Sequence, residues 1–104
     1  DNPLNFVDPS GTAMFVYSIQ RGVELGLLKA KEYTPVAYRG YQSLFPFIQV
    51  NDRGLLDVIG ACDGVVIKKN FVEYVTVPKI LNAKEAVAGI LWAAVIMETE
   101  QLKK

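Results

Sequence analysis

Histidine is absent from this chain of 104 residues, and cysteine occurs once, as Cys62. The lack of histidine excludes every histidine-based catalytic triad and removes the commonest general base and metal ligand. A single cysteine cannot form an internal disulfide, so the sequence gives no sign of an oxidising compartment. With no histidine to activate it, Cys62 is predicted to be a small loop residue and not a nucleophile. We therefore expect no metal ion and no cofactor.

A net charge is also absent, because 11 lysines and arginines balance 11 aspartates and glutamates. Without a basic surplus, neither nucleic acid nor an anionic membrane is expected as a partner. The longest apolar run, residues 86–97, is shorter than the roughly 18–20 residues that cross a bilayer. Hydrophobic residues nevertheless make up 51% of the chain. A short chain of this composition is expected to self-associate or to belong inside a larger assembly.

A first helix is predicted to start at Asp8 and Pro9. The aspartate can accept hydrogen bonds from the first free amides, and proline is preset for the first helical position. This helix should run to about Leu25, with Gly26 as its left-handed stop. Its expected apolar stripe consists of Thr12, Phe15, Val16, Ile19 and Val23.

The middle of the chain is predicted to hold a helix and a β ribbon. A second helix, apolar on one side only, is expected over residues 31–49, although Pro46 should kink or shorten its end. Residues 51–54, from Asn51 to Gly54, are predicted to form a turn. Residues 55–59 and 71–77 are rich in strand-forming side chains, and the two segments could pair as a small antiparallel ribbon.

A final helix is predicted to end near Gln101. Asn82 followed by Glu85 resembles a capping box, which marks its start. Residues 86–97 are apolar around the whole circumference, so they should be buried around the whole circumference. A stripe of small residues suits close packing against another helix: Ala86, Gly89 and Ala93.

The three helices differ in how much of their surface is apolar. The first is apolar on several sides, the second on one side and the third on all sides. This order of inner, outer and inner helices is expected of an (α/α) toroid. We therefore predict a mainly α chain, residues 1–104, that forms one segment of a partial (α/α) six-hairpin barrel. Three main helices and a short antiparallel β ribbon would make up this segment.

Two groups of residues are candidates for chemistry. The carboxylates of Asp57, Asp63 and Glu73 could meet as an acid/base pair, although solvated ribbon and loop positions are the favoured interpretation. The two inner helices offer a second possibility. If they run in the same direction, their N-termini open on one face, where free amides and hydroxyls suit a carboxylate or sugar hydroxyls. The alternative is that the polar residues at these helix starts only cap the helices and bind no ligand. The candidate substrate-binding residues are Ser10, Thr12, Asn82 and Lys84.

Residues 8–17 (DPSGTAMFVY) resemble a helix motif of the unsaturated rhamnogalacturonyl hydrolases and unsaturated glucuronyl hydrolases, glycoside hydrolase families 105 and 88. The resemblance continues in order and spacing over nearly the whole chain. Further positions that carry it are Arg21, Gly22, Val23, Gly26, Tyr33, Val36, Ala37, Gly40, Asp52, Arg53, Gly54, Glu73, Tyr74, Pro78, Asn82, Leu91, Ala93, Ala94 and Glu98.

This resemblance implies a C-terminal part of a larger bacterial (α/α) barrel enzyme, cytoplasmic or periplasmic. Such enzymes remove unsaturated uronic acid from the oligosaccharides that polysaccharide lyases release, for example from rhamnogalacturonan in pectin. Hydration of the sugar double bond starts the reaction, with one aspartate as general acid and base. That aspartate lies upstream of the matched region, so no catalytic residue is assigned here and the chain is expected to be inactive alone. A non-catalytic helical module that self-associates through its last helix is the alternative.

Overall fold

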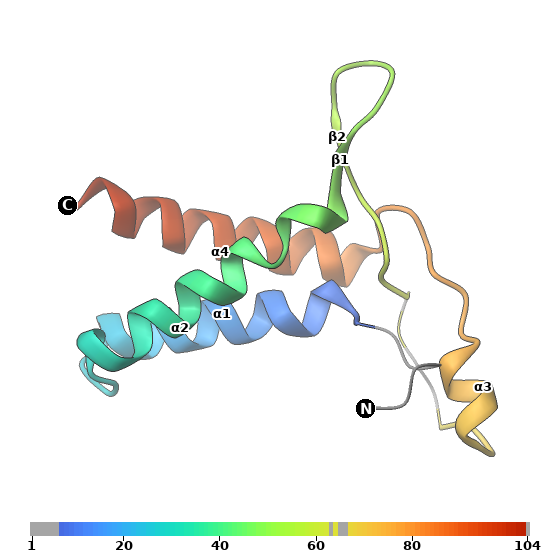
Figure 1. Cartoon of the computed structure of the whole chain (residues 1–104), viewed down its shortest axis with the longest axis horizontal. Helices are drawn as coiled ribbons and strands as arrows, with labels where there is room; N and C mark the ends of the chain where they lie inside the picture. Colours follow the sequence, from blue (N-terminus) through green and yellow to red (C-terminus); the bar gives the residue numbers. More distant parts are fainter. Residues whose placement is uncertain (1–6, 63, 65–66, 104) are drawn as a thin grey trace.

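A computed structural model describes residues 7–62, 64 and 67–103 (Figure 1). Within these residues, most of the chain is helical. The elements follow in the order α1 (Pro9–Glu24), α2 (Ala30–Gln42), the 3₁₀ turn η1 (Phe45–Phe47), β1 (Ile48–Val50), β2 (Leu56–Val58), α3 (Phe71–Val75) and α4 (Lys84–Leu102).

Helix α1 begins and ends where the sequence predicts. The Asp8 side chain accepts a hydrogen bond from the Ser10 amide, and Pro9 occupies the first helical position. After the C-cap residue Leu25, Gly26 has a φ of 78°, the left-handed conformation that glycine adopts without strain. Local signals alone therefore determine both ends of this helix.

The buried line along α1 differs from the predicted stripe. Only Val16 belongs to both, whereas Phe15 is 71% exposed. The reason is that α1 packs against both α2 and α4, and small side chains let these two helices approach it closely. The residues that are buried instead are Pro9, Ala13, Val16 and Gln20.

The predicted ribbon exists, but one of its two strands was placed wrongly. Helix α2 ends at Gln42, and residues 45–47 turn the chain into β1, which pairs antiparallel with β2 in the register Ile48↔Val58 and Val50↔Leu56. Residues 71–75 are not a strand: they form α3, which starts because the Asn70 side chain accepts a hydrogen bond from the Glu73 amide. Pairing across the turn at 51–54 closes a much shorter loop than pairing with residues 71–77 would.

The predicted capping box of α4 is also wrong. Ala83 is the N-cap residue, and no side chain caps the helix. Asn82 has a φ of 56°, and its side chain is held by β2: Oδ1 accepts from the Val58 amide at 2.7 Å, and Nδ2 donates to Asp57 at 3.0 Å. The asparagine therefore fastens the start of α4 to the ribbon and does not close the helix end.

Helix α1 lies between α2 and α4 in the folded chain, and α1 and α4 run in the same direction (Figure 1). The predicted small-residue stripe is confirmed, since Ala86, Gly89 and Ala93 are all buried. A Cβ atom added at Gly89 would lie 3.2 Å from the Ala13 Cβ, so the two helices are close together here. The core residues are Ala13, Val16, Ala37, Tyr41, Leu44, Val58, Ala61, Ala83, Ala86, Ile90, Ala93, Ile96 and Met97.

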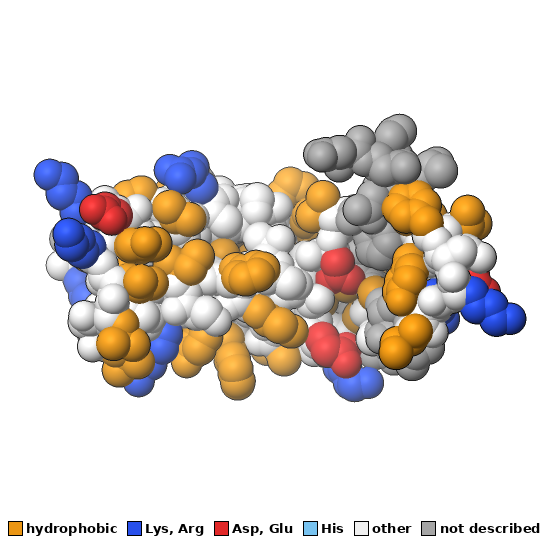
Figure 2. Space-filling model, turned by 90° about the horizontal axis from the view of Figure 1, so that it is seen from below, with side chains coloured by type: hydrophobic (Ala, Val, Ile, Leu, Met, Phe, Trp, Pro, Cys, Tyr) orange, Lys and Arg blue, Asp and Glu red, His pale blue; other side chains and the backbone are white. Residues whose placement is uncertain are grey.

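The opposite side of α4 is not covered by the described part of the chain. Leu91, Trp92 and Val95 are exposed by 58%, 63% and 67%. Two other helices and a short ribbon can cover such a helix only in part, and the described residues leave this side of α4 exposed. On the face seen in Figure 2, hydrophobic side chains are spread over the helices, while lysines and arginines lie mainly at the edges. No helix in the described ranges is long and apolar enough to span a membrane.

Polar contacts also connect the three long helices, partly buried beside this core. The fully buried Gln20 accepts a hydrogen bond from Thr34 Oγ1 at 3.0 Å and donates one to Glu100 at 3.4 Å. The Tyr41 hydroxyl donates to Glu98 at 2.8 Å. Burial, together with the hydrogen bond to Glu98 and its negative charge, raises the pKa of Tyr41 to about 12. These contacts join α1 to α2, α1 to α4 and α2 to α4.

Candidate functional site

The N-terminal ends of α1 and α4 lie at the same end of the molecule (Figure 1), as the sequence predicts for two inner helices. Two chain segments lie beside these helix starts and are hydrogen-bonded to each other. The Ile80 amide donates to the Ala61 carbonyl at 2.7 Å, and the Asn82 amide donates to the Val58 carbonyl at 2.8 Å. Residues 79–82 therefore run alongside residues 58–62. We call the polar residues gathered here the helix-start cluster: Asp8, Ser10, Asp57, Cys62 and Asn82.

Asp8 connects α1 to the loop after β2. Its Oδ1 accepts from the Ser10 amide at 2.8 Å and from the Ser10 hydroxyl at 2.6 Å. Its Oδ2 accepts from the Cys62 amide at 3.2 Å and faces the Cys62 Sγ at 3.3 Å. Burial raises the pKa of this carboxyl, but the hydrogen bonds from Ser10 and Cys62 outweigh burial, so the net pKa is below the ordinary value. Asp8 is therefore ionised and serves as a structural cap.

Cys62 is a poor nucleophile in this position. The residue is 7% exposed, and burial raises the pKa of its thiol, as do the hydrogen bond to Asp8 and the negative charge of that carboxylate. Since the thiolate is the reactive form, a raised pKa keeps the sulfur unreactive near neutral pH. This agrees with the interpretation of Cys62 as a small loop residue.

The candidate carboxylates have separate local partners. Asp57 accepts hydrogen bonds from the side-chain amides of Asn82, at 3.0 Å, and Asn51, at 3.4 Å. Glu73 accepts from the Lys69 amide at 2.8 Å, on the short helix α3. Asp63 lies outside the described residues. Within the described ranges, no group of three or more histidine, cysteine, aspartate or glutamate side chains could hold a metal ion.

The four candidate substrate-binding residues are placed differently by the fold. Ser10 and Asn82 make structural hydrogen bonds, to Asp8 and to β2. Thr12 is half-buried in the first turn of α1. Lys84 is the first residue of α4: its side chain is 77% exposed, with Nζ 3.7 Å from Glu85 Oε1. The start of α1 is closed by the Asp8 carboxylate, whereas the start of α4 has no side-chain cap. The first amides of α4 can therefore donate hydrogen bonds to a carboxylate or a hydroxyl.

A groove extends from this end of the molecule along α4. It has a volume of about 680 Å³ and lies between the ribbon and the first half of the helix. Asn82 and Lys84 stand beside it, and the rest of its lining is apolar: Ile48, Leu56, Val58, Val87, Ala88, Ile90 and Leu91. The candidate residues Asn82 and Lys84 are thus brought together at one groove.

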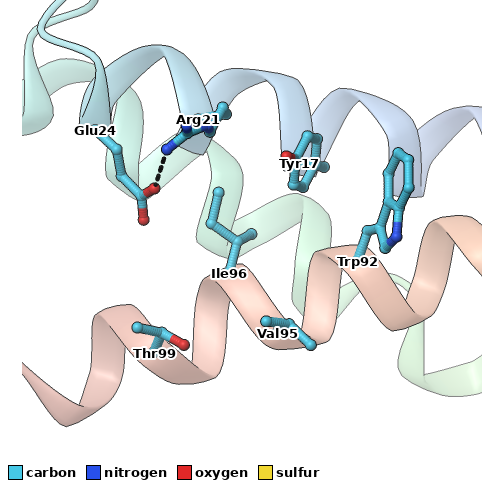
Figure 3. A pocket seen from close by; sticks show the side chains of 7 residues that line it. All are labelled: Tyr17, Arg21, Glu24, Trp92, Val95, Ile96 and Thr99. Atoms are coloured by element: carbon cyan, nitrogen blue, oxygen red, sulfur yellow. Dashed lines mark hydrogen bonds and ion pairs between the residues drawn. The ribbon is translucent and has the colours of Figure 1, made fainter.

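A second groove, which the sequence did not predict, lies between α1 and α4 (Figure 3). Tyr17, Arg21 and Glu24 line it from α1, and Trp92 and Thr99 are among the α4 residues that face them. Its volume is about 390 Å³. The only hint in the sequence was the Trp92 indole, the one polar group within the apolar run of α4.

Comparison with known proteins places this architecture in a family. The model of Glycosyl Hydrolase Family 88 matches residues 1–101. The chain belongs to glycosyl hydrolase family 88. Its structure is similar to that of a glycoside hydrolase from family 105 of C. acetobutylicum ATCC 824, at 26% sequence identity and a TM-score of 0.84. No curated protein sequence matches the chain significantly.

The similarity to the C. acetobutylicum enzyme covers 94% of this chain but only 29% of that enzyme. The family resemblance seen in the sequence is therefore confirmed, and so is the fold class: a mainly α segment of an (α/α) barrel with a short antiparallel ribbon. The chain is a member of a carbohydrate-degrading hydrolase family, and it spans less than a third of the length of the similar enzyme.

Proposed function

We propose that this chain is the C-terminal part of a glycoside hydrolase that removes unsaturated uronic acid from lyase-generated oligosaccharides, such as those from the rhamnogalacturonan of pectin. The observation that carries the proposal is the parallel pair α1 and α4, whose starts lie at one end of the molecule as neighbouring inner helices of a barrel would (Figure 1). The family match and the similar family 105 enzyme support it.

The helix-start cluster then borders the substrate. Asp8 and Asn82 fasten the loops around the two helix starts, as their hydrogen bonds indicate. The uncapped amides of α4, together with the exposed Lys84, would face the carboxylate of the uronic acid, because an unsaturated uronate is an anion. Ser10 and Thr12 on α1 would contact sugar hydroxyls.

This chain on its own would not catalyse the reaction. Asp57 and Glu73 are each held by local hydrogen bonds, on different elements. The catalytic aspartate would come from another part of the barrel. Further hairpins of that barrel would cover Leu91 and Val95, whose exposure is costly in water.

The experiment compares this chain with the product of the full reading frame that contains it. Both are incubated with an unsaturated uronyl disaccharide, and turnover is followed by the loss of absorbance of the sugar double bond. We expect turnover by the longer protein only. In that protein, Lys84→Met should raise KM, since the lysine binds a carboxylate that the substrate already carries before the reaction. Lys31→Met, on exposed α2, is the matched control. A longer protein without turnover, or equal KM values for both variants, would contradict the proposal.

The exposed side of α4 supports a second candidate function, a non-catalytic helical module that self-associates. Leu91, Trp92 and Val95 form an apolar surface that a second copy could cover. Light scattering over a range of protein concentrations tests this. The module hypothesis requires an oligomer that Val95→Glu dissociates, whereas a monomer at high concentration counts against it.

A further inference from the structure

Asp57 is the carboxylate that connects the ribbon to the start of α4 (Figure 1). It lies in the middle of β2, is half-buried, and accepts a hydrogen bond at Oδ1 from the side-chain amide of Asn82 at 3.0 Å. The reaction proposed above takes its catalytic aspartate from another part of the barrel. The contact with Asn82 therefore indicates what this carboxylate does instead.

The Asp57 carboxylate determines which way the side chain of Asn82 points. A carboxylate only accepts hydrogen bonds, so it selects the Nδ2 end of the asparagine. Oδ1 of Asn82 is then directed to the amide of the buried Val58, from which it accepts at 2.7 Å. The Asn82 backbone amide also donates to the Val58 carbonyl at 2.8 Å. Three hydrogen bonds thus hold one asparagine against β2, and both ends of its side chain have a partner.

Asp57 is itself held from the side of the ribbon turn. The side-chain amide of Asn51 donates to the same Oδ1 atom at 3.4 Å. Oδ1 of Asn51 accepts from the amides of Arg53 and Leu55, at 2.9 and 3.0 Å, so the turn fixes this asparagine in place. Because two donors converge on one oxygen, the Asp57 side chain has little freedom to turn away from Asn82.

The segment that Asp57 holds leads directly to a candidate binding residue. Asn82 has a φ of 56°, so the chain turns sharply there before it enters α4 through the buried Ala83. Lys84 follows as the first residue of the helix, and both Asn82 and Lys84 stand beside the groove next to the ribbon. A single residue separates the two, so the place of Lys84 relative to the ribbon depends on the contacts of Asn82.

We propose that Asp57 is a positioning residue for substrate binding, which acts through Asn82 on Lys84. Asp57 does not touch the substrate. Its carboxylate keeps the Asn82 amide in one orientation, and this keeps the start of α4 and the Lys84 ammonium at a fixed place beside the ribbon. The inference rests on the function proposed above, which assigns Lys84 to the carboxylate of the uronic acid. A binding group that is held in place before the ligand arrives loses less entropy on binding.

A double-mutant cycle in the longer protein tests this role, with the unsaturated uronyl disaccharide as substrate. Asp57→Ala removes the acceptor and should raise KM by about tenfold, which corresponds to one hydrogen bond to a charged group. Asp57→Asn keeps an acceptor oxygen for Asn82 and should recover most of that loss. Asp57→Ala combined with Lys84→Met should have the KM of Lys84→Met alone, because the effect of Asp57 passes through the lysine.

Gln49→Ala is the matched control, because Gln49 is exposed and pairs directly with Asp57 across the ribbon. Its KM should equal that of the wild type. Circular dichroism and urea midpoints verify that each variant is folded under the assay conditions. If Asp57→Ala does not fold, Asn82→Gly takes its place in the cycle, since it removes the same contact and tolerates the left-handed backbone.

The proposal is overturned by a wild-type KM for folded Asp57→Ala, or by an Asp57→Asn variant as impaired as Asp57→Ala. It is also overturned if the effects of Asp57→Ala and Lys84→Met on KM multiply in the double variant, because independent effects indicate a merely structural role for Asp57. Wild-type turnover combined with any of these results refutes this inference and leaves the proposed function standing. A longer protein without turnover refutes the proposed function and this inference with it.

Discussion

Asn82 provides the sharpest test of how the start of α4 is held. Its side chain accepts a hydrogen bond from the amide of the buried Val58 and donates one to Asp57, while its backbone is left-handed with a φ of 56°. Asn82→Gly removes both side-chain bonds but tolerates this backbone conformation. The buried Val58 amide would lose its partner, which costs about 1–3 kcal/mol. We expect that loss in the free energy of unfolding.

Asn82→Ala separates the backbone term from the hydrogen bonds. Alanine loses the same two bonds and also adopts the left-handed conformation at a cost of about 1–2 kcal/mol. The greater freedom of glycine in the unfolded chain offsets about 0.4–1 kcal/mol of this difference. The alanine variant should therefore be less stable than the glycine variant by about 1 kcal/mol.

Urea unfolding at pH 7, followed by circular dichroism and by Trp92 emission, measures both values. An Asn82→Gly variant as stable as the wild type would refute the role of the side chain in holding α4 to the ribbon. An alanine variant at least as stable as the glycine variant would refute the left-handed conformation. Either result would show that Asn82 does not have the structural role described here, and Asn82 would again be a candidate for substrate binding.

Four further predictions concern the core and the helix-start cluster. The folded pKa of Asp8 is lowered, so the stabilisation that its carboxylate gives to the fold is complete above the unfolded pKa of about 4 and is lost as the pH falls through the folded pKa. The urea midpoint of the wild type should therefore drop in acid, and that of Asp8→Asn should drop less. In an ultraviolet titration, one of the five tyrosines should ionise at about 12, and Tyr41→Phe should abolish that step; a single transition near 10 would argue against the contact with the carboxylate. Leu44→Ala should lower the free energy of unfolding by about 2–5 kcal/mol, whereas Leu55→Ala, at a 57% exposed position, should change it by about 0.5 kcal/mol or less, and similar losses at both sites would contradict the assigned core. Iodoacetamide should modify Cys62 more slowly in the folded chain than in urea, and equal rates would show that the thiol is accessible and reactive.

Features that depend on neighbouring residues were predictable from the sequence. Asp8 and Pro9 start α1, and Gly26 stops it, because each acts on amides or dihedral angles within one turn of its own position. The same holds for the turn at residues 51–54, where Gly54 has a φ of 76°. The small-residue stripe of α4 also predicted correctly which side of this helix would pack closely against another helix.

The candidate site was only partly predictable, because it depends on residues that are far apart in the sequence as well as on neighbouring ones. The sequence indicated that two helix starts could share one face, and Figure 1 confirms that α1 and α4 run in the same direction. It did not indicate that Asn82 would bind β2, because the partner amide, at Val58, is 24 residues away. Nor could it indicate the groove between Tyr17 and Trp92, whose residues are 75 positions apart and meet only when the helices pack.

By itself, the sequence determined the family, the ends of α1 and the close-packing side of α4, since motifs, caps and small residues act through local geometry. Only the tertiary structure decided which side of α1 is buried, which strand pairs with β2 and what Asn82 binds. In each of these cases the local pattern favoured another arrangement: the stripe through Phe15 on α1, a strand over residues 71–77 and a capping role for Asn82. Packing against residues distant in the sequence selected one arrangement, because burial and hydrogen-bond satisfaction are properties of the whole fold.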